Sequence, residues 1–312
     1  MTKYAFLFLI PLFLAFSCTE PKSPTNELYA SRADLPSLSG KSTYLGTPFT
    51  AAGDRIYLIG NQDGSFPDMG WHVDGEMGGI WMHPIKLMDG FTASISSEET
   101  SICLDNGKSF LNYSIANAIE FDASNLGLEV NRLHFVPDGK TGMLVLFEVK
   151  NVDKSEKSIR FQFNAYVDLM PVWLGERTEM MDTTDVISYD EQTGVFTGKD
   201  QGNNWYTIWG SSSEFPLSPV EISCEMNPKG KGTAAGAAID LIIPAGESIR
   251  IPIFIAGSDQ SNLAALEAFA DLKANYVDDW FAKKSRYELL KQTAEIQIPD
   301  VELQQAYEWI KY

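Results

Sequence analysis

The chain is poor in cysteine, histidine, positive charge and long apolar runs, and each shortage excludes a class of protein. Its 312 residues include 3 Cys and 3 His, so a framework of several disulfides cannot hold the fold together. Its 24 Lys and Arg against 42 Asp and Glu give a formal net charge of −18. Binding to a nucleic-acid backbone depends on clustered positive charge and is therefore excluded. We interpret the acidity as that of a well-solvated exported surface, and we expect no cofactor.

The amino terminus has the features of an export signal. Lys3 precedes an apolar stretch over residues 4–16, which is shorter than the roughly 20 residues that a membrane span needs. The residues before Cys18 resemble a loose bacterial lipobox, which implies cleavage there and lipidation of its sulfur. The alternative is an ordinary export signal with an incidental Cys. We expect a signal peptide over 1–17 and a lipid-anchored flexible tail over 18–42, with the protein in the bacterial cell envelope, in the periplasm or on the outer-membrane surface.

Two cysteines, Cys103 and Cys224, remain after such processing. Both lie in stretches that resemble strands, where Cys behaves as a small apolar residue. We therefore expect two buried, unpaired thiols. The sequence leaves open whether the two residues come close enough to form one bridge.

Residues 43–257 carry the signals of strands and turns. Apolar and polar side chains alternate over residues 158–168, which is typical of a strand with one face on a core and the other in water. Residues 143–150 precede this strand across a short polar turn and predict a hairpin with it. Another alternating run covers residues 249–255. Many strands joined by Gly-containing turns indicate a mainly β chain, built as a large sandwich of antiparallel sheets.

Helical periodicity replaces the strand pattern toward the carboxyl end. It predicts a helical linker over residues 258–295. Asp300 is placed to cap a further helix whose apolar stripe includes Leu303 and Ile310. Such a stripe is stabilised mainly by tertiary burial. We therefore expect residues 296–312 to begin a further helical domain whose remainder the chain does not contain.

Aromatic, imidazole and carboxylate side chains are densest in the Gly-rich stretch 60–91. Flat rings offer surfaces for the C–H faces of pyranose sugars, and carboxylates accept hydrogen bonds from sugar hydroxyls. We therefore expect carbohydrate binding there. The alternative is a structural corner with the Trp side chains in the core. The spacing of the two His fits neither an HExxH helix nor a closed zinc site, so we expect no metal. The candidate sugar contacts are Trp71, His72, Glu76, Trp81 and His83.

Five runs together resemble the amino-terminal region of bacterial glycogen-debranching-type glycoside hydrolases, the amylo-α-1,6-glucosidase-like group. The resemblance extends from about Leu45 to the end of the chain and is strongest in the first run. It implies a β-supersandwich domain before an (α/α)6 barrel, with the last run at the start of the barrel's first helix. The runs are GEMGGIWMHPIKLMDGF (75–91), FVPDGKTG (135–142), PVWLGERTEM (171–180), IPAGESIRIPIFIAGS (243–258) and IPDVELQQAYEWIKY (298–312).

The resemblance also implies where the chemistry lies. The catalytic acid and base would be carboxylates on the barrel, beyond Tyr312, so no catalytic residue is assigned in this chain. The residues expected to make interdomain contacts are Trp173, Glu176, Arg177 and Trp309.

Our interpretation is a non-catalytic module of an exported glycoside hydrolase of the debranching or α-glucosidase type. It would shape the substrate entrance and pack on the catalytic barrel. Its partners would be that barrel and an α-glucan or oligosaccharide substrate, with the membrane contacted through the lipid alone. One alternative is a free-standing carbohydrate-binding lipoprotein, and another is a structural partner that contacts protein only.

Overall fold

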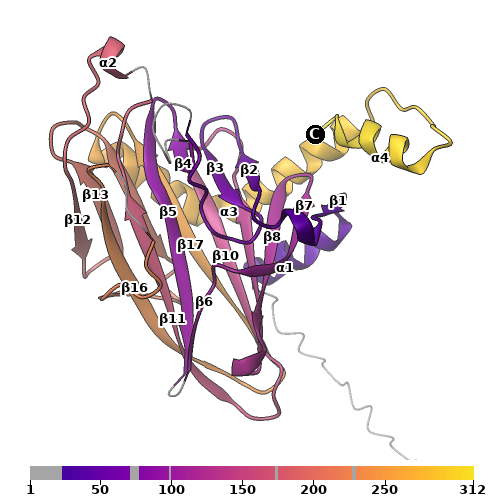
Figure 1. Ribbon diagram of the computed structural model, residues 1–312, viewed down its shortest axis with the longest axis horizontal. Coiled ribbons are helices and arrows are strands. Elements are labelled where there is room, and N and C mark those ends of the chain that lie inside the picture. The colour runs from indigo at the N-terminus through magenta and orange to yellow at the C-terminus, as the bar shows by residue number, and fades with distance from the viewer. Residues whose placement is uncertain (1–22, 71–76, 98–99, 173–174, 227–229) are drawn as a thin grey trace, which may run out of the picture.

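The computed structural model describes residues 23–70, 77–97, 100–172, 175–226 and 230–312, and shows two antiparallel sheets packed face to face (Figure 1). The predicted mainly β sandwich is thereby confirmed. Within these residues the larger sheet has nine strands, in the order β1 (Ser37–Ser39), β7 (Gly107–Tyr113), β8 (Ala116–Ala123), β9 (Leu128–Phe135), β10 (Gly142–Asn151), β17 (Ser248–Ser258), β14 (Tyr206–Ser211), β13 (Val195–Asp200) and β12 (Asp185–Asp190).

The smaller sheet has eight strands within the same residues. Its order is β15 (Ser218–Val220), β16 (Thr233–Ile243), β11 (Lys157–Val167), β5 (Ile85–Ser96), β4 (Gly79–Met82), β3 (Tyr57–Asn61) and β2 (Pro48–Ala52), and β6 (Ser101–Cys103) pairs with β5 off this path. The helices are α1 (Pro24–Ser31), α2 (Gly175–Thr178), α3 (Asn262–Lys291) and α4 (Val301–Trp309). Short 3-10 helices cover Arg32–Asp34, Ser42–Tyr44 and Ser124–Leu126.

The main core lies between the two sheets. In β11 the predicted alternation places Phe161 and Phe163 in this core, while Gln162 and Asn164 lie on the opposite face. The ring of Phe147 in β10 meets both from the other sheet, with centroids 4.9 and 6.5 Å from theirs. Full burial of one such side chain contributes roughly 1.5–3 kcal/mol, so the alternation fixes which face of the strand is covered.

The hairpin expected between residues 143–150 and 158–168 does not form. These residues lie in β10 and β11, which belong to different sheets, so the turn between them crosses the sandwich. A second crossing, from β16 to β17, lies beside it, and Asn151 joins the two. Its Nδ2 donates to the carbonyl oxygens of Ser155 and Ile243 at 2.8 and 2.9 Å. The prediction was wrong because alternation shows which face is buried but not which strands pair.

A second core covers the outer face of the nine-stranded sheet. Helix α3 packs on β17, β14 and β10 and buries Phe269 and Trp280. Trp280 meets Phe135 edge-on with centroids 5.1 Å apart, and Phe269 meets Phe254 in the same way at 6.3 Å. The segment expected to be a helical linker is therefore a long helix that completes the core of the β domain.

Residues 23–42, expected to be part of a flexible tail, are attached to the sandwich: α1 and Leu35 pack on this second core, and β1 pairs with β7. Leu28 and Tyr29 of α1 are buried. The guanidinium groups of Arg32 and Arg250 lie 3.5 and 4.7 Å from the centroid of the Tyr29 ring. The expectation was wrong for this segment because two apolar side chains in a polar stretch are enough to dock a short helix when a preformed surface receives them.

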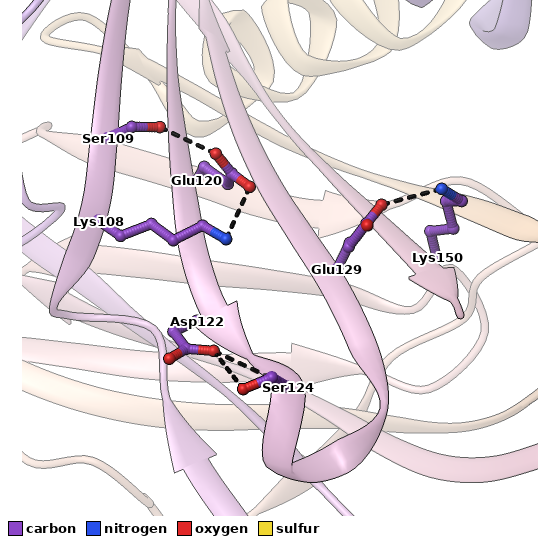
Figure 2. A network of polar contacts seen from close by, with 7 residues as sticks. All are labelled: Lys108, Ser109, Glu120, Asp122, Ser124, Glu129 and Lys150. Carbon is purple, nitrogen blue, oxygen red and sulfur yellow. Dashed lines mark hydrogen bonds and ion pairs between the residues drawn. The ribbon is translucent and has the colours of Figure 1, made fainter. Parts of the chain in front are cut away.

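Away from the second core, the outer face of the nine-stranded sheet is charged, as Figure 2 shows. Lys108 of β7 pairs with Glu120 of β8 at 2.8 Å, and Lys150 of β10 pairs with Glu129 of β9 at 2.9 Å. All four side chains are well exposed, and ion pairs of this kind add little to stability. Their role is to keep this part of the sheet solvated.

Helix α4 extends away from the sheets at the carboxyl end (Figure 1). Asp300 caps it as predicted, because its Oδ1 accepts a hydrogen bond from the backbone N–H of Leu303 at 3.0 Å. Leu303 and Ile310 are 60% and 83% exposed. Tyr312, just after the helix, stacks on Tyr287 of α3 with centroids 5.9 Å apart. The apolar stripe therefore faces solvent while the end of the arm contacts α3.

Candidate functional site

The structure describes two of the five predicted sugar contacts. Trp81 lies in β4, and His83 lies in the turn between β4 and β5. The other three, Trp71, His72 and Glu76, lie outside the described residues, and their role stays a prediction.

Strand pairing places Trp81 in a row of side chains across three strands. Its cross-strand neighbours are Tyr57 in β3 and Lys86 in β5. The residues that alternate with them, such as Leu58 and Ile80, lie in the core between the sheets. Tyr57, Trp81 and Lys86 therefore share the outer face of the eight-stranded sheet.

The indole of Trp81 is buried on this outer face. It is 4% exposed, and its Nε1 donates a hydrogen bond to the carbonyl oxygen of Gly78 at 3.1 Å. A buried indole with a satisfied N–H has no free face for a sugar. Trp81 instead supports the ring of His83, whose centroid lies 5.9 Å away.

Tyr57 and His83 form a ring pair on the solvent side of Trp81. Tyr57 Oη and His83 Nε2 are hydrogen-bonded at 2.8 Å, and the ring centroids lie 5.6 Å apart at an interplanar angle of 30°. His83 is exposed and Tyr57 half-buried. Partial burial raises the pKa of Tyr57, so its hydroxyl stays protonated at neutral pH. The pair places one exposed and one half-buried ring with polar atoms at the surface, and whether these rings contact sugar stays a prediction.

Behind Trp81 lies a buried charged group. The ammonium of Lys86 is 5.7 Å from the centroid of the Trp81 ring, forms an ion pair with Asp89, and lies 3.6 Å from Asp168 Oδ2. Lys86 and Asp168 are each 1% exposed. A charged lysine is tolerated at such depth only when it is paired. The carboxyl groups of this cluster therefore explain how Lys86 can be buried.

Two carboxyl groups near this cluster have strongly raised pKa values. Burial, reinforced by the charge of Asp89, raises the pKa of Asp168 to about 8. Burial also raises the pKa of Asp185 to about 7, although its Oδ2 accepts a hydrogen bond from Leu169 N at 2.8 Å. At neutral pH Asp168 is therefore mostly protonated and adds no second full negative charge beside Asp89.

A loop over residues 220–226 covers the polar part of the same outer face. Asn164 Nδ2 donates to the carbonyl oxygen of Ser223, and Gln162 Nε2 donates to that of Glu221, both at 2.7 Å. The polar side chains that β11 turns away from the core thus bind loop backbone, which needs hydrogen-bond partners once it is buried.

A disulfide between Cys103 and Cys224 ties this loop to β6, with Cα atoms 5.7 Å apart. The expectation of two unpaired thiols was therefore wrong. Cys103 does end a strand, but Cys224 lies in the loop with a φ of 52°, which is uncommon for a residue other than Gly. The bridge joins residues separated by 121 positions, and a contact so distant cannot be seen in the local sequence pattern.

The structure describes the side chains of two of the four predicted interdomain residues, and these two lie apart. Arg177 lies exposed in α2, and Trp309 lies half-buried at the end of α4, and the two helices are at different sides of the sandwich (Figure 1). Glu176 belongs to α2, and nothing is described of its side chain. Trp173 lies outside the described residues, as does Cys18, the predicted site of lipidation.

In the part of the chain that the structure describes, no three His, Cys, Asp or Glu side chains gather as they would around a metal ion. Over the same ranges, no helix combines the length and the apolar character needed to cross a bilayer.

Sequence reasoning missed Tyr57, Lys86 and Asp168. Tyr57 lies 26 positions before its partner His83, and only the pairing of β3 with β4 brings them together. Lys86 and Asp89 lie within the Gly-rich stretch 60–91, but the sequence does not show that both are buried. The only local signal was a Lys between the apolar residues Ile85 and Leu87.

No protein-family model and no curated protein sequence matches this chain. Among solved structures it is similar to a protein from the human microbiome provisionally named as a kojibiose phosphorylase, with 10% identity and a TM-score of 0.46 over 88% of this chain and 34% of that one. The chain thus spans about a third of that protein.

Two further structures show the same level of similarity. An Escherichia coli K12 protein provisionally named as an aldose 1-epimerase has 8% identity and a TM-score of 0.42, over 68% of this chain and 99% of that one. A protein named heparinase III has 9% identity and a TM-score of 0.42, over 72% and 36%.

Proposed function

We propose that the chain is a non-catalytic β-sandwich module of an exported glycoside hydrolase that acts on α-glucosidic bonds, and that it binds sugar through Tyr57 and His83. The observation that carries this proposal is the ring pair on the solvent side of Trp81. Its rings are held by a hydrogen bond and by the indole beneath, so little side-chain freedom is lost when a sugar packs on them. The resemblance of residues 75–91 to debranching-type hydrolases supports the choice of α-glucosidic substrates.

The placement of the perturbed carboxyl groups supports a non-catalytic role. A glycosidase needs two carboxyl groups that flank the bond to be broken. Asp168, 1% exposed and beside Lys86, has no access to a substrate, and Asp185 is 3% exposed. Their raised pKa values follow from burial in the domain interior rather than from a cleft.

Export and attachment to a helical barrel belong to the same proposal. The Cys103–Cys224 disulfide supports export, because such bonds persist in oxidising compartments. The exposed Leu303 in α4 and Ile310 directly after it support packing against a barrel helix, since an apolar stripe of this kind is normally covered by a neighbouring helix. Anchoring in the cell envelope through a lipid on Cys18 completes the proposal.

The test is the affinity of the chain for maltoheptaose, measured by isothermal titration calorimetry. The double substitution Tyr57→Ala and His83→Ala should weaken binding about fivefold to a hundredfold, because ring contacts of this kind contribute about 0.5–1.5 kcal/mol each. Tyr44→Ala, at a tyrosine that is 53% exposed elsewhere, is the matched control and should bind as the unaltered chain does. Equal affinity of all three proteins would refute the assignment, and hydrolysis of maltoheptaose by the chain would refute the non-catalytic role.

A further inference from the structure

A cavity of about 200 Å³ lies between the β7–β8 hairpin, β2 and the ends of α3 and α4. The helix side contributes the aromatic rings of Tyr287, Trp309 and Tyr312. Tyr312 stacks on Tyr287, and Trp309 meets Tyr312 edge-on with centroids 5.7 Å apart. The strand side contributes the amides of Asn112 and Asn117. The cavity thus has ring faces on one wall and amide groups on the other.

Two buried polar atoms on this lining lack a partner among the described residues. Asn117 is 3% exposed, and its Nδ2 donates to Asn112 Oδ1, which leaves Asn117 Oδ1 without a donor. Tyr312 Oη is likewise buried and unpaired. Buried polar atoms in proteins are nearly always hydrogen-bonded, so each unpaired one needs an explanation. A ligand that carries hydroxyl groups would satisfy both.

The charge on the lining points to a neutral ligand. The ammonium of Lys283 donates to the carbonyl oxygens of Ala52 and Val136 at 2.8 and 2.7 Å, and lies 3.3 Å from Asp138. Its three donors are therefore engaged, and none is left to recognise an anion. A neighbouring cavity of about 170 Å³ shares Tyr287 and Tyr312 but is lined by charged side chains, namely Asp34, Lys284, Glu288 and Lys291.

We propose that the cavity of 200 Å³ binds one neutral sugar ring, with its hydroxyls on Asn117 Oδ1 and Tyr312 Oη and its C–H face on the ring of Trp309. Sites for drug-sized molecules start at about 300 Å³, so this one suits a single ring rather than a chain of rings. It is separate from the Tyr57–His83 surface and does not depend on it.

The experiment titrates the full chain with methyl α-D-glucopyranoside and follows the Trp309 indole N–H signal by NMR. We expect this signal to shift on addition of the sugar. Tyr312→Phe removes the unpaired hydroxyl but keeps the ring that stacks on Tyr287, and it should weaken binding about threefold to tenfold. The matched control is Tyr307→Phe in α4, because the Tyr307 hydroxyl donates to the carbonyl oxygen of Ala294 outside the cavity. This control should leave the affinity unchanged.

Thermal unfolding checks that the variants fold. Because Tyr312→Phe removes a hydroxyl that has no partner, its Tm should equal or exceed that of the unaltered chain. A Trp309 signal that sugar does not move would overturn the proposal, as would equal affinities of Tyr312→Phe and Tyr307→Phe. Shifts confined to residues around Tyr57 and His83 would also overturn it while leaving the surface site intact.

Discussion

At the scale of single residues, burial decides what the charged groups of this domain do. Lys86 and Asp89 form an ion pair in the interior, and Asp168 beside them takes up a proton at neutral pH. The net charge of the cluster is therefore small, because Lys86 and Asp89 neutralise each other and Asp168 holds a proton.

This cluster predicts a pH dependence of stability. The pKa of Asp168 is about 8 in the folded chain and about 3.9 in an unfolded one, so the folded chain holds more protons between these values. The free energy of unfolding should therefore fall as the pH rises from about 4 to 8, by on the order of 1 kcal/mol or more. Urea unfolding at pH 5, 7 and 9 measures how steeply this free energy falls with pH. Asp168→Asn should reduce that slope, and the part of the slope that comes from the raised pKa of Asp185 should remain.

The matched control for this prediction is Asp240→Asn. Asp240 is an exposed carboxylate whose pKa is lowered by its hydrogen bonds with Arg160, so it is already ionised over this pH range. Its replacement should leave the slope unchanged. A slope that Asp168→Asn leaves as steep as before would show that Asp168 is ionised in the folded chain.

At the scale of elements, α3 and the loop over residues 220–226 each cover an outer face of the sandwich. They do so by different means: α3 buries apolar rings, whereas the loop is held by hydrogen bonds from Gln162 and Asn164 and by a disulfide. Removing a side chain from the apolar cover should therefore cost packing energy, whereas weakening the polar cover should loosen the loop locally.

Removing one ring from α3 tests the apolar cover. Phe269→Ala should lower the free energy of unfolding by about 3–5 kcal/mol, because Phe269 is 4% exposed and its loss leaves a cavity beside Phe254. Leu263→Ala on the same helix, where the side chain is 66% exposed, should change it by less than about 0.5 kcal/mol. Guanidinium unfolding measures both. Similar losses in the two variants would mean that α3 does not pack as described.

Breaking the disulfide tests the polar cover. Cys224→Ser should speed hydrogen exchange of the backbone amides in residues 220–226 and lower the free energy of unfolding by about 2–5 kcal/mol. Because Cys224→Ser leaves the thiol of Cys103 free, the double variant Cys103→Ser, Cys224→Ser is the control and should behave like the single variant. Unchanged exchange in the loop would show that its hydrogen bonds alone hold it.

At the scale of the whole molecule, local pattern predicted the architecture but not the long-range contacts. Alternation over residues 158–168 and the Gly-containing turns were enough to infer a sandwich, because period two is a property of the strand itself. The pairing of β10 with β17, the Cys103–Cys224 bridge and the docking of α1 join segments far apart in sequence. Nothing in a local window encodes these contacts.

For the candidate site, too, the sequence predicted residue types but not the contacts between distant segments. The composition of residues 60–91 pointed to His83, which the structure places at the surface. It also pointed to Trp81, whose ring is buried, and it gave no hint of Tyr57, which pairs with β4 from another strand. Residue type indicates what chemistry a stretch can perform. Which of its rings reach solvent is decided by how the sheets and loops pack.

The most direct measurement is a crystal structure of the chain soaked with maltotriose. We expect a glucose ring packed on Tyr57 and His83, with Trp81 still buried behind them. A crystal that holds maltotriose elsewhere on the chain, with the Tyr57–His83 pair bare at a saturating concentration, would contradict it.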